Sequence, residues 1–350
     1  MSSAVTERAF IGQLRHLLKP LDKWRLDPAT DELCINRPNE VFVRQRGVFV
    51  RHEIDFPFEI CYAIAKLAGA INEQNVNDET PIVGSEMPDG ERIQAIVPPC
   101  VQPGTVALSI RIPGARVAPT SDVPKRYKLK KWNKWSDRKL VRHANHAAIL
   151  DAYDSGNIVR FLDEIVRLRL NPVLCGKTGS GKTSALNTLI SSIPLDERIF
   201  SIENALEIVM PHLNCVRTVY SHGDQGTSKV TQKDLLAACL RMRPDRIIVG
   251  ELRDDESSYL YVNEIMTGHE GSPCTVHGRT AGQAANRIAN MYRASAAGRS
   301  SDKADVISQL GMVIDVIIPF EEDKGEYDLG EIWLAADAER RGETIAELFR

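Results

Sequence analysis

Hydrophobic and polar positions alternate with two different periods in the first third of the chain. Apolar residues at helical spacing before Pro20 predict an amphipathic helix over 6–18. Short apolar runs separated by turn residues then predict a meander of antiparallel strands, followed by a second helix and two further strands. The strand segments are 33–35, 41–43, 48–50, 92–97 and 106–111, and the second helix spans 58–71. This part of the chain is predicted to form a small α+β domain.

The second part of the chain has a different pattern, in which apolar runs alternate with stretches of helical spacing. Apolar residues on one face predict a helix over 157–168, which leads into the apolar run 172–174. Further strand patterns occur at 198–203, 215–220, 246–250 and 273–277. Strands that alternate with helices predict a largely parallel sheet covered on both faces. Ligands of such sheets bind at the carboxyl ends of the strands.

A glycine-rich stretch separates the predicted strand 172–174 from a predicted helix at 184–190 and fits the phosphate-loop template G-x-x-x-x-G-K-[ST]. Its glycines allow successive backbone N–H groups to point at a polyphosphate, and the following helix adds its positive dipole end. By this template Lys182 reaches the β- and γ-phosphates, and the Thr183 hydroxyl is a ligand of Mg²⁺. The residues predicted to bind ATP in this loop are Gly176, Lys177, Thr178, Gly179, Ser180, Gly181, Lys182 and Thr183.

Three polar residues lie where predicted strands end, which places them near the phosphate loop. Glu203 and Glu251 are the acids, and His277 follows an apolar run. A carboxylate near Mg²⁺ can position or deprotonate the attacking water, and a histidine can contact the γ-phosphate. Phosphoryl transfer also needs positive charge opposite the leaving group. Arg241 and Arg243, just before the strand of Glu251, are candidates, although arginines near a helix end are also ordinary dipole partners.

Charge and cysteine content limit the function classes. The chain has 44 basic and 47 acidic side chains, so its formal charge of -3 gives no global attraction to nucleic acid or membrane. A local basic stretch over 125–142, interleaved with Tyr127, Trp132 and Trp135, could grip phosphates or an anionic membrane, or be a solvated linker. Seven scattered cysteines without a C-x-x-C pair fit a reducing cytoplasm. No signal peptide or membrane-spanning run is expected.

Four segments in a fixed order resemble the motifs of the secretion ATPase superfamily, the hexameric motors of type II and type IV secretion and of type IV pili. They are the phosphate loop, Ile202-Glu203-Asn204, the run from Leu240 to Glu251, and Thr275-Val276-His277-Gly278. In that family these segments are the Walker A motif, the aspartate box, the Walker B motif and the histidine box. The chain is most similar to the type IV secretion traffic ATPase, and segments at 35–41, 97–99 and 109–111 extend the likeness into the first half.

The resemblance implies roles for individual residues. Glu251 corresponds to the Walker B glutamate that orients water and holds Mg²⁺ through water, Glu203 to the aspartate-box acid, and His277 to the γ-phosphate sensor. Arg111 corresponds to an arginine that reaches nucleotide from the N-terminal domain, whereas its position alone favours a solvated strand end. The chain departs from the family pattern at Asn204, where an aspartate is usual, and at Pro273-Cys274, where small or hydroxylic residues are usual.

The resemblance also implies an organisation. We expect an N-terminal α+β domain over 1–115, a basic linker over 116–150 and a RecA-like ATPase domain with a mainly parallel sheet over 151–350. The expected assembly is a homohexamer at the cytoplasmic face of the inner membrane, in peripheral contact with it. The expected partners are other secretion components, including the other ATPases and inner-membrane proteins. The long linker suggests that the N-terminal domain swaps onto a neighbouring protomer.

Several functions remain alternatives to an ATP-hydrolysing motor that drives type IV secretion or its assembly. A nucleotide-gated scaffold would bind ATP without much turnover, and a nucleic-acid-translocating ATPase would use the basic stretch. A small-molecule kinase would need an arginine-rich lid and an acceptor pocket, which nothing in the sequence marks. A guanine-nucleotide switch has still less support, because neither Asn-Lys-x-Asp nor Asp-x-x-Gly occurs and the guanine-reading elements are therefore missing.

Overall fold

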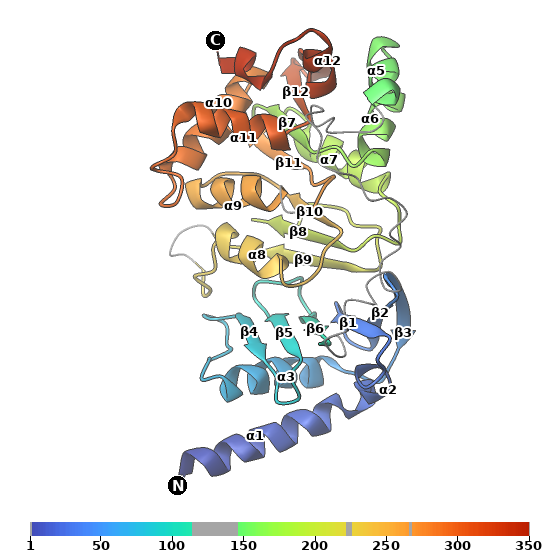
Figure 1. Ribbon diagram of the computed structural model, residues 1–350, viewed down its shortest axis with the longest axis vertical. Helices are drawn as coiled ribbons and strands as arrows, with labels where there is room; N and C mark the ends of the chain where they lie inside the picture. The colour runs from blue at the N-terminus through green and yellow to red at the C-terminus, as the bar shows by residue number, and fades with distance from the viewer. Residues whose placement is uncertain (1, 114–145, 222–225, 266–267, 350) are drawn as a thin grey trace, which may run out of the picture.

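The computed structural model describes residues 2–113, 146–221, 226–265 and 268–349. It contains two separate sheets that follow one another along the chain and along the long axis of the molecule (Figure 1). The basic stretch 125–142 and most of the predicted linker lie outside the described residues. The expected fold class, an α+β part followed by a mainly parallel α/β part, is confirmed.

The first sheet is antiparallel and has the strand order β3-β2-β1-β6-β5-β4. Its strands are β1 (Thr30–Ile35), β2 (Glu40–Gln45), β3 (Val48–Glu53), β4 (Ile82–Glu86), β5 (Arg92–Ile96) and β6 (Ala107–Arg111). The expected meander is formed by β1, β2 and β3, which pair antiparallel in sequence order. The pattern at 82–86 was not recognised as a strand, because only Ile82 and Val83 are strand-like before Gly84 and Ser85.

Helices cover one face of this first sheet. They are α1 (Ser2–Leu18), η1 (Lys19–Leu21), α2 (Asp22–Arg25) and α3 (Phe58–Ile71). Leu14 and Leu18 of α1 are buried together with Ile64 of α3 and Leu108 of β6. The amphipathic opening helix predicted before Pro20 is therefore a packing element of this core.

The second sheet has the order β13-β12-β7-β11-β10-β8-β9, and the pairs from β12 to β9 are all parallel. Its parallel strands are β7 (Pro172–Gly176), β8 (Ile199–Glu203), β9 (Cys215–Val219), β10 (Arg246–Val249), β11 (Cys274–His277) and β12 (Val316–Asp323). Two antiparallel partners, β13 (Glu326–Leu329) and β14 (Trp333–Leu334), pair with β12. The helices are α5 (His146–Asp154), α6 (Ile158–Arg167), α7 (Lys182–Ser191), α8 (Gln232–Cys239), α9 (Asp255–Ile265), α10 (Ala281–Ala294), α11 (Lys303–Val313), α12 (Ala335–Arg340) and η4 (Ile345–Phe349).

Both faces of the second sheet are buried, as the apolar strand patterns require. Ile247 and Val249 of β10 pack in the core beneath α8 to α11, while Ile248 between them packs in the core beneath α6 and α7. In β7, Val173 likewise packs in the core beneath α8 to α11, and Leu174 packs in the core beneath α6 and α7. None of the helices in the described part of the chain has both the length and the apolar character needed to cross a membrane.

The two sheets meet at β9, the edge strand of the second sheet that lies nearest to the first (Figure 1). Val101 forms an isolated antiparallel bridge with Thr218, and the N–H of Val219 donates to the carbonyl of Cys100 at 3.0 Å. Arg198, almost fully buried, donates to Asn36 of the first sheet at 2.8 Å. Ile96 of β5 and Ala107 of β6 are buried in the same core as Val249 of β10, so part of the first sheet belongs to the core of the second part.

Candidate active site

The phosphate loop connects β7 to α7, as its template requires. Gly179 and Gly181 have φ angles of 82° and 86°, which lie in the left-handed region that residues with a Cβ rarely adopt. Gly181 is also the residue that precedes α7, so the backbone turns there directly into the first helical turn. The unpaired N–H groups of that turn, together with the helix dipole, form an anion-binding position.

Lys182 begins α7 and folds its side chain back over the loop. Its Nζ donates to the carbonyl oxygens of Gly176 at 3.0 Å and of Lys177 at 2.7 Å. Burial lowers the pKa of Lys182, although the charge of Glu251 opposes that shift. The ammonium group is thus partly desolvated and held by neutral carbonyls, which a phosphate group can replace with a stronger, charged acceptor.

Glu251 and His277, expected to meet at the carboxyl ends of their strands, do so. The Nε2 atom of His277 lies 2.8 Å from Oε1 of Glu251. The other carboxylate oxygen of Glu251 accepts a hydrogen bond from Arg253 at 2.6 Å. β11 lies between β7 and β10 in the sheet, so this group stands beside the phosphate loop.

Glu203 ends β8 and is almost fully buried. Its carboxylate accepts hydrogen bonds from Ser201 Oγ and from the backbone N–H groups of Glu207 and Ile208, each at 2.8 Å. Burial raises the pKa of Glu203, and these hydrogen bonds oppose that rise. The carboxylate is therefore rigidly positioned by its own loop, whereas its neighbour Asn204 is exposed.

A pocket of about 330 Å³ brings these residues together, within the range of ligand-binding cavities. The residues that line it include Thr178, Gly179, Lys182, Thr183, Glu203, Glu251, Arg253 and His277. Among the described residues, no three His, Cys, Asp or Glu side chains are arranged to hold a metal ion by themselves. The pocket instead offers the Thr183 hydroxyl and the carboxylates of Glu203, Glu207 and Glu251, a set of hard oxygen donors that fits a Mg²⁺ ion held mainly by phosphates and water.

The three arginines predicted to contact nucleotide do not line this pocket. Arg111 and Arg241 line a separate cavity of about 360 Å³ between the first sheet and the end of α8. Arg243, with a positive φ of 52°, contributes to the field at Glu32 of the first sheet. Arg241 and Arg243 precede β10, so they lie at the amino edge of the parallel sheet, whereas Glu251 follows β10 at the carboxyl edge. The contact of these three arginines with nucleotide therefore stays a prediction.

Two features of the site were missed from the sequence. Arg253 lies only two residues after Glu251, and this short spacing was a signal from which the ion pair between the two residues could have been predicted. Phe320 and Tyr327, which lie beside the phosphate loop, belong to a C-terminal segment that carries no phosphate-binding motif. At the departure from the family pattern, Pro273 directly precedes β11 and Cys274 is the first residue of that strand, so the two residues do not interrupt it.

Comparison with known proteins agrees with the likeness of the sequence motifs. A family model described as type II/IV secretion system protein matches residues 19–318. The chain is similar to Protein VirB11 of Rhizobium radiobacter, with 46% identity over 336 residues that cover 96% of this chain and 98% of that protein. The type IV secretion system protein VirB11 of Bartonella henselae is 34% identical and covers 90% of this chain and 91% of its own.

One solved structure is similar over almost the whole length. The crystal structure of the VirB11 ATPase from the Brucella suis type IV secretion system, in complex with sulphate, superposes with a TM-score of 0.85. Its sequence is 27% identical, and the match covers 96% of this chain and 98% of that chain. The similarity therefore includes both sheets and the loop between β7 and α7.

Proposed function

The chain belongs to the type II/IV secretion system protein family, and on that premise we propose that it is an ATP-hydrolysing motor of a type IV secretion system. The observation that carries the proposal is the convergence of Lys182, Glu251 and His277 on one pocket. Lys182 begins α7, whereas Glu251 and His277 lie at the ends of two strands, β10 and β11. The fold therefore brings them together. Relatives named VirB11, one of which is described as an ATPase, support the assignment.

In the proposed reaction the triphosphate lies across the loop with its γ-phosphate toward Glu251. Lys182 exchanges its two carbonyl acceptors for phosphate oxygens, and the N–H groups of the first turn of α7 bind the same anion. Glu251 accepts a proton from the attacking water or orients it, while Arg253 fixes one of its oxygens. His277, on the other oxygen, is placed to donate to the γ-phosphate as charge develops there.

A Mg²⁺ ion would be held by the Thr183 hydroxyl, by phosphate oxygens and, through water, by Glu251. It would supply positive charge that stabilises the phosphoryl group in the transition state. Glu203 lines the same pocket, and its three hydrogen bonds fix it where it can accept from a water molecule near the ion.

We propose a homohexamer as the working assembly, at the cytoplasmic face of the inner membrane beside other secretion components. Arg111, Arg241 and Arg243 support a multimer, because none of them lines the candidate active-site pocket of its own chain, and the arginine that assists phosphoryl transfer can come from a neighbouring subunit. Two of them share a cavity that is open toward the surface, and Arg111 is more than half exposed. A swap of the N-terminal domain between protomers is part of the same proposal.

The test is the rate of phosphate release from ATP by the purified full-length protein. Lys182→Ala should abolish turnover, because Lys177, the other lysine of the loop, is paired with Glu322 and does not occupy the position of the Lys182 ammonium group. Lys233→Ala, which removes an exposed lysine of α8 paired with Glu256, is the matched control and should keep wild-type turnover. Unchanged turnover in Lys182→Ala would reject the motor, and ATP binding without phosphate release in the wild type would instead favour a nucleotide-gated scaffold.

A further inference from the structure

The hairpin formed by β12 and β13 extends past the end of the strand that carries the phosphate loop. β12 pairs with β7 in parallel register until Phe320 lies opposite Gly176, the last residue of β7. It then continues through Asp323 and returns as β13 after Lys324 and Gly325. Both turn residues have positive φ angles, of 52° and 87°, as a tight two-residue hairpin turn requires. The hairpin therefore overhangs the loop that begins where β7 stops.

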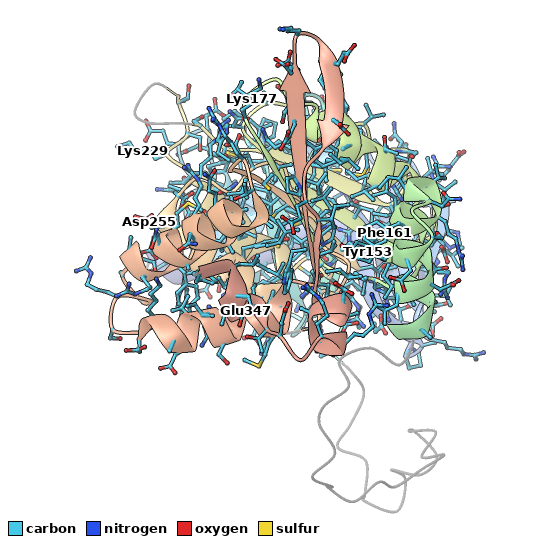
Figure 2. All side chains as sticks on the ribbon, turned by 90° about the horizontal axis from the view of Figure 1, so that it is seen from above. Tyr153, Phe161, Lys177, Lys229, Asp255 and Glu347 are labelled. Carbon is cyan, nitrogen blue, oxygen red and sulfur yellow. The ribbon has the colours of Figure 1, made fainter. Side chains whose placement is uncertain are left out.

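One face of the hairpin is turned toward the phosphate loop. Tyr327 is the cross-strand partner of Glu322, so the two side chains share a face, and Phe320 shares it two residues earlier. Glu322 forms an ion pair with Lys177 of the loop at 3.0 Å. The ring of Tyr327 approaches Gly181 so closely that a Cβ added to this glycine would lie 3.4 Å from the ring. Figure 2 shows the hairpin projecting beyond the sheet with Lys177 beside it.

A third cavity lies between this face and the loop. It has a volume of about 540 Å³ and is lined by Gly179 to Ser184 together with Phe320 and Tyr327. It shares Gly179, Lys182 and Thr183 with the pocket that contains Glu251 and His277. The loop thus borders two cavities, one lined by acids and an imidazole and the other by two aromatic rings.

The direction of a bound nucleotide follows from these two spaces. The γ-phosphate belongs on the side of Glu251 and His277, because the reacting groups are there. The remainder of the nucleotide then leaves the loop on the opposite side, past Ser184 and toward the aromatic rings. Tyr327 is 68% exposed although it is a large aromatic residue, so its ring has a free face for a planar partner.

We propose that Tyr327, supported by Phe320, is the platform on which the purine base of the nucleotide stacks. The proposal rests on the proposed function, since it takes a nucleoside triphosphate as the ligand of the loop. The ion pair between Lys177 and Glu322 holds the hairpin at the loop, so that the ring is in place before the nucleotide arrives. A preorganised platform adds affinity without the entropic cost of ordering a free strand.

The test compares the affinity of the full-length protein for ATP with its affinity for inorganic tripolyphosphate, which has the phosphates but no base. Tyr327→Ala should raise the Kd for ATP about 5- to 150-fold, the range of a lost stacking contact, and leave the Kd for tripolyphosphate unchanged. Tyr327→Phe should keep the affinity for ATP. Leu195→Ala is the matched control, because it removes another exposed apolar side chain, 64% exposed, from the segment that precedes β8.

The outcomes separate the platform from the proposed function. An unchanged ATP affinity in Tyr327→Ala overturns the platform, and so does an equal loss for ATP and tripolyphosphate, which would mean that the ring only orders the loop. If the wild type binds neither ligand, or if Lys182→Ala binds both as the wild type does, the proposed function itself fails and the platform with it. A selective loss of ATP affinity in Tyr327→Ala that Tyr327→Phe restores supports the stacking contact.

Discussion

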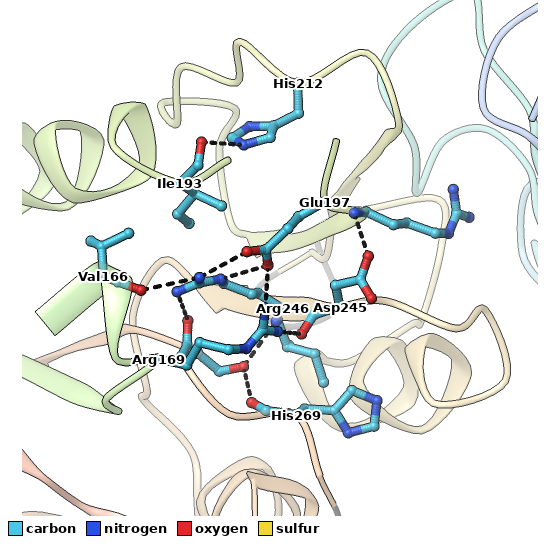
Figure 3. A network of polar contacts seen from close by, with 12 residues as sticks. Val166, Arg169, Ile193, Glu197, His212, Asp245, Arg246 and His269 are labelled. Atoms are coloured by element: carbon cyan, nitrogen blue, oxygen red, sulfur yellow. Dashed lines mark hydrogen bonds and ion pairs between the residues drawn. The ribbon is translucent and has the colours of Figure 1, made fainter. Parts of the chain in front are cut away.

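Removal of Glu197, whose partner Arg246 is buried, should destabilise the second sheet far more than removal of Glu164, whose partner Arg167 is exposed. Figure 3 shows the carboxylate of Glu197 in contact with the guanidinium groups of Arg246 and Arg169. Its carboxylate accepts two hydrogen bonds from Arg246, at 2.8 and 2.9 Å, and one from Arg169 at 2.8 Å. The Arg246 side chain is only 3% exposed and that of Glu197 13%, so water replaces little of this pairing.

The magnitude follows from that burial. Glu197→Ala leaves the guanidinium of Arg246 buried without a carboxylate, a change that typically costs about 3–5 kcal/mol. The carbonyls of Val166 and Gly271, at 3.2 and 3.5 Å, remain as weak neutral acceptors and do not replace the charge. Glu164→Ala is the matched control, because the Arg167 side chain with which Glu164 pairs is 55% exposed. Such an exposed pair contributes at most about 1 kcal/mol.

The assay is urea unfolding of the two variants and the wild type, followed by circular dichroism at neutral pH. Burial would raise the pKa of Glu197, but the hydrogen bonds and charges of Arg246 and Arg169 outweigh it and hold the pKa below its ordinary value. The unfolded state therefore binds this proton more readily, and the stabilisation is fully present above the unfolded pKa of about 4.3. It is lost as the pH falls through the lower folded pKa, so the gap between wild type and Glu197→Ala should narrow in acid. Equal destabilisation of Glu197→Ala and Glu164→Ala at neutral pH would refute the reasoning.

Two further predictions concern the reaction and a helix start. Glu251→Gln should lower phosphate release by about 10²–10⁴-fold and keep ATP binding, since the amide no longer takes a proton from water; single-turnover release at the wild-type rate would exclude Glu251 as the base. Thr231→Ala should lower the free energy of unfolding by about 1 kcal/mol, because Thr231 and Asp234 form a reciprocal capping box at the start of α8; an unchanged urea midpoint would contradict it.

The parts of the fold with a strong local pattern were predictable from the sequence. The phosphate loop, the strands that end at Glu203 and Glu251, and the strand of His277 were placed by apolar runs and a glycine motif. Their convergence then followed from the rule that parallel strands present their carboxyl ends at one edge. The same rule, applied to Arg241 and Arg243, places residues that precede β10 at the opposite edge, as the structure has them.

Other parts of the site depend on contacts that no local pattern records. Pro319 interrupts the apolar run of β12, and a proline argues against a central strand, so the hairpin beside the loop was not expected. Tyr327 acquires its place only because β12 pairs with β7, more than a hundred residues away in the sequence. Such tertiary pairing decides which exposed aromatic residue lies at a binding loop and which is an ordinary surface residue.

A continuous set of contacts leads from the candidate active site to the first sheet. Oε1 of Glu203, at the end of β8, lies 3.8 Å from Nε of Arg217 in β9. The backbone carbonyl of Arg217 in turn accepts the N–H of Gln102, in the segment between β5 and β6, at 3.1 Å. β8 and β9 pair in register over five residues, so neither strand slides without the loss of those backbone hydrogen bonds.

This connection limits how the protein can respond to hydrolysis. If loss of the γ-phosphate displaces Glu203, then Arg217 has to follow, or the contact between the two side chains has to break. In the first case the bond to Gln102 transmits the displacement to the first sheet, because paired strands move as one rigid element. In the second case the backbone hydrogen bond from Gln102 to the Arg217 carbonyl is kept, and the first sheet is not displaced. Only the first response changes the relation between the two sheets, which is the requirement for a motor that converts nucleotide hydrolysis into movement.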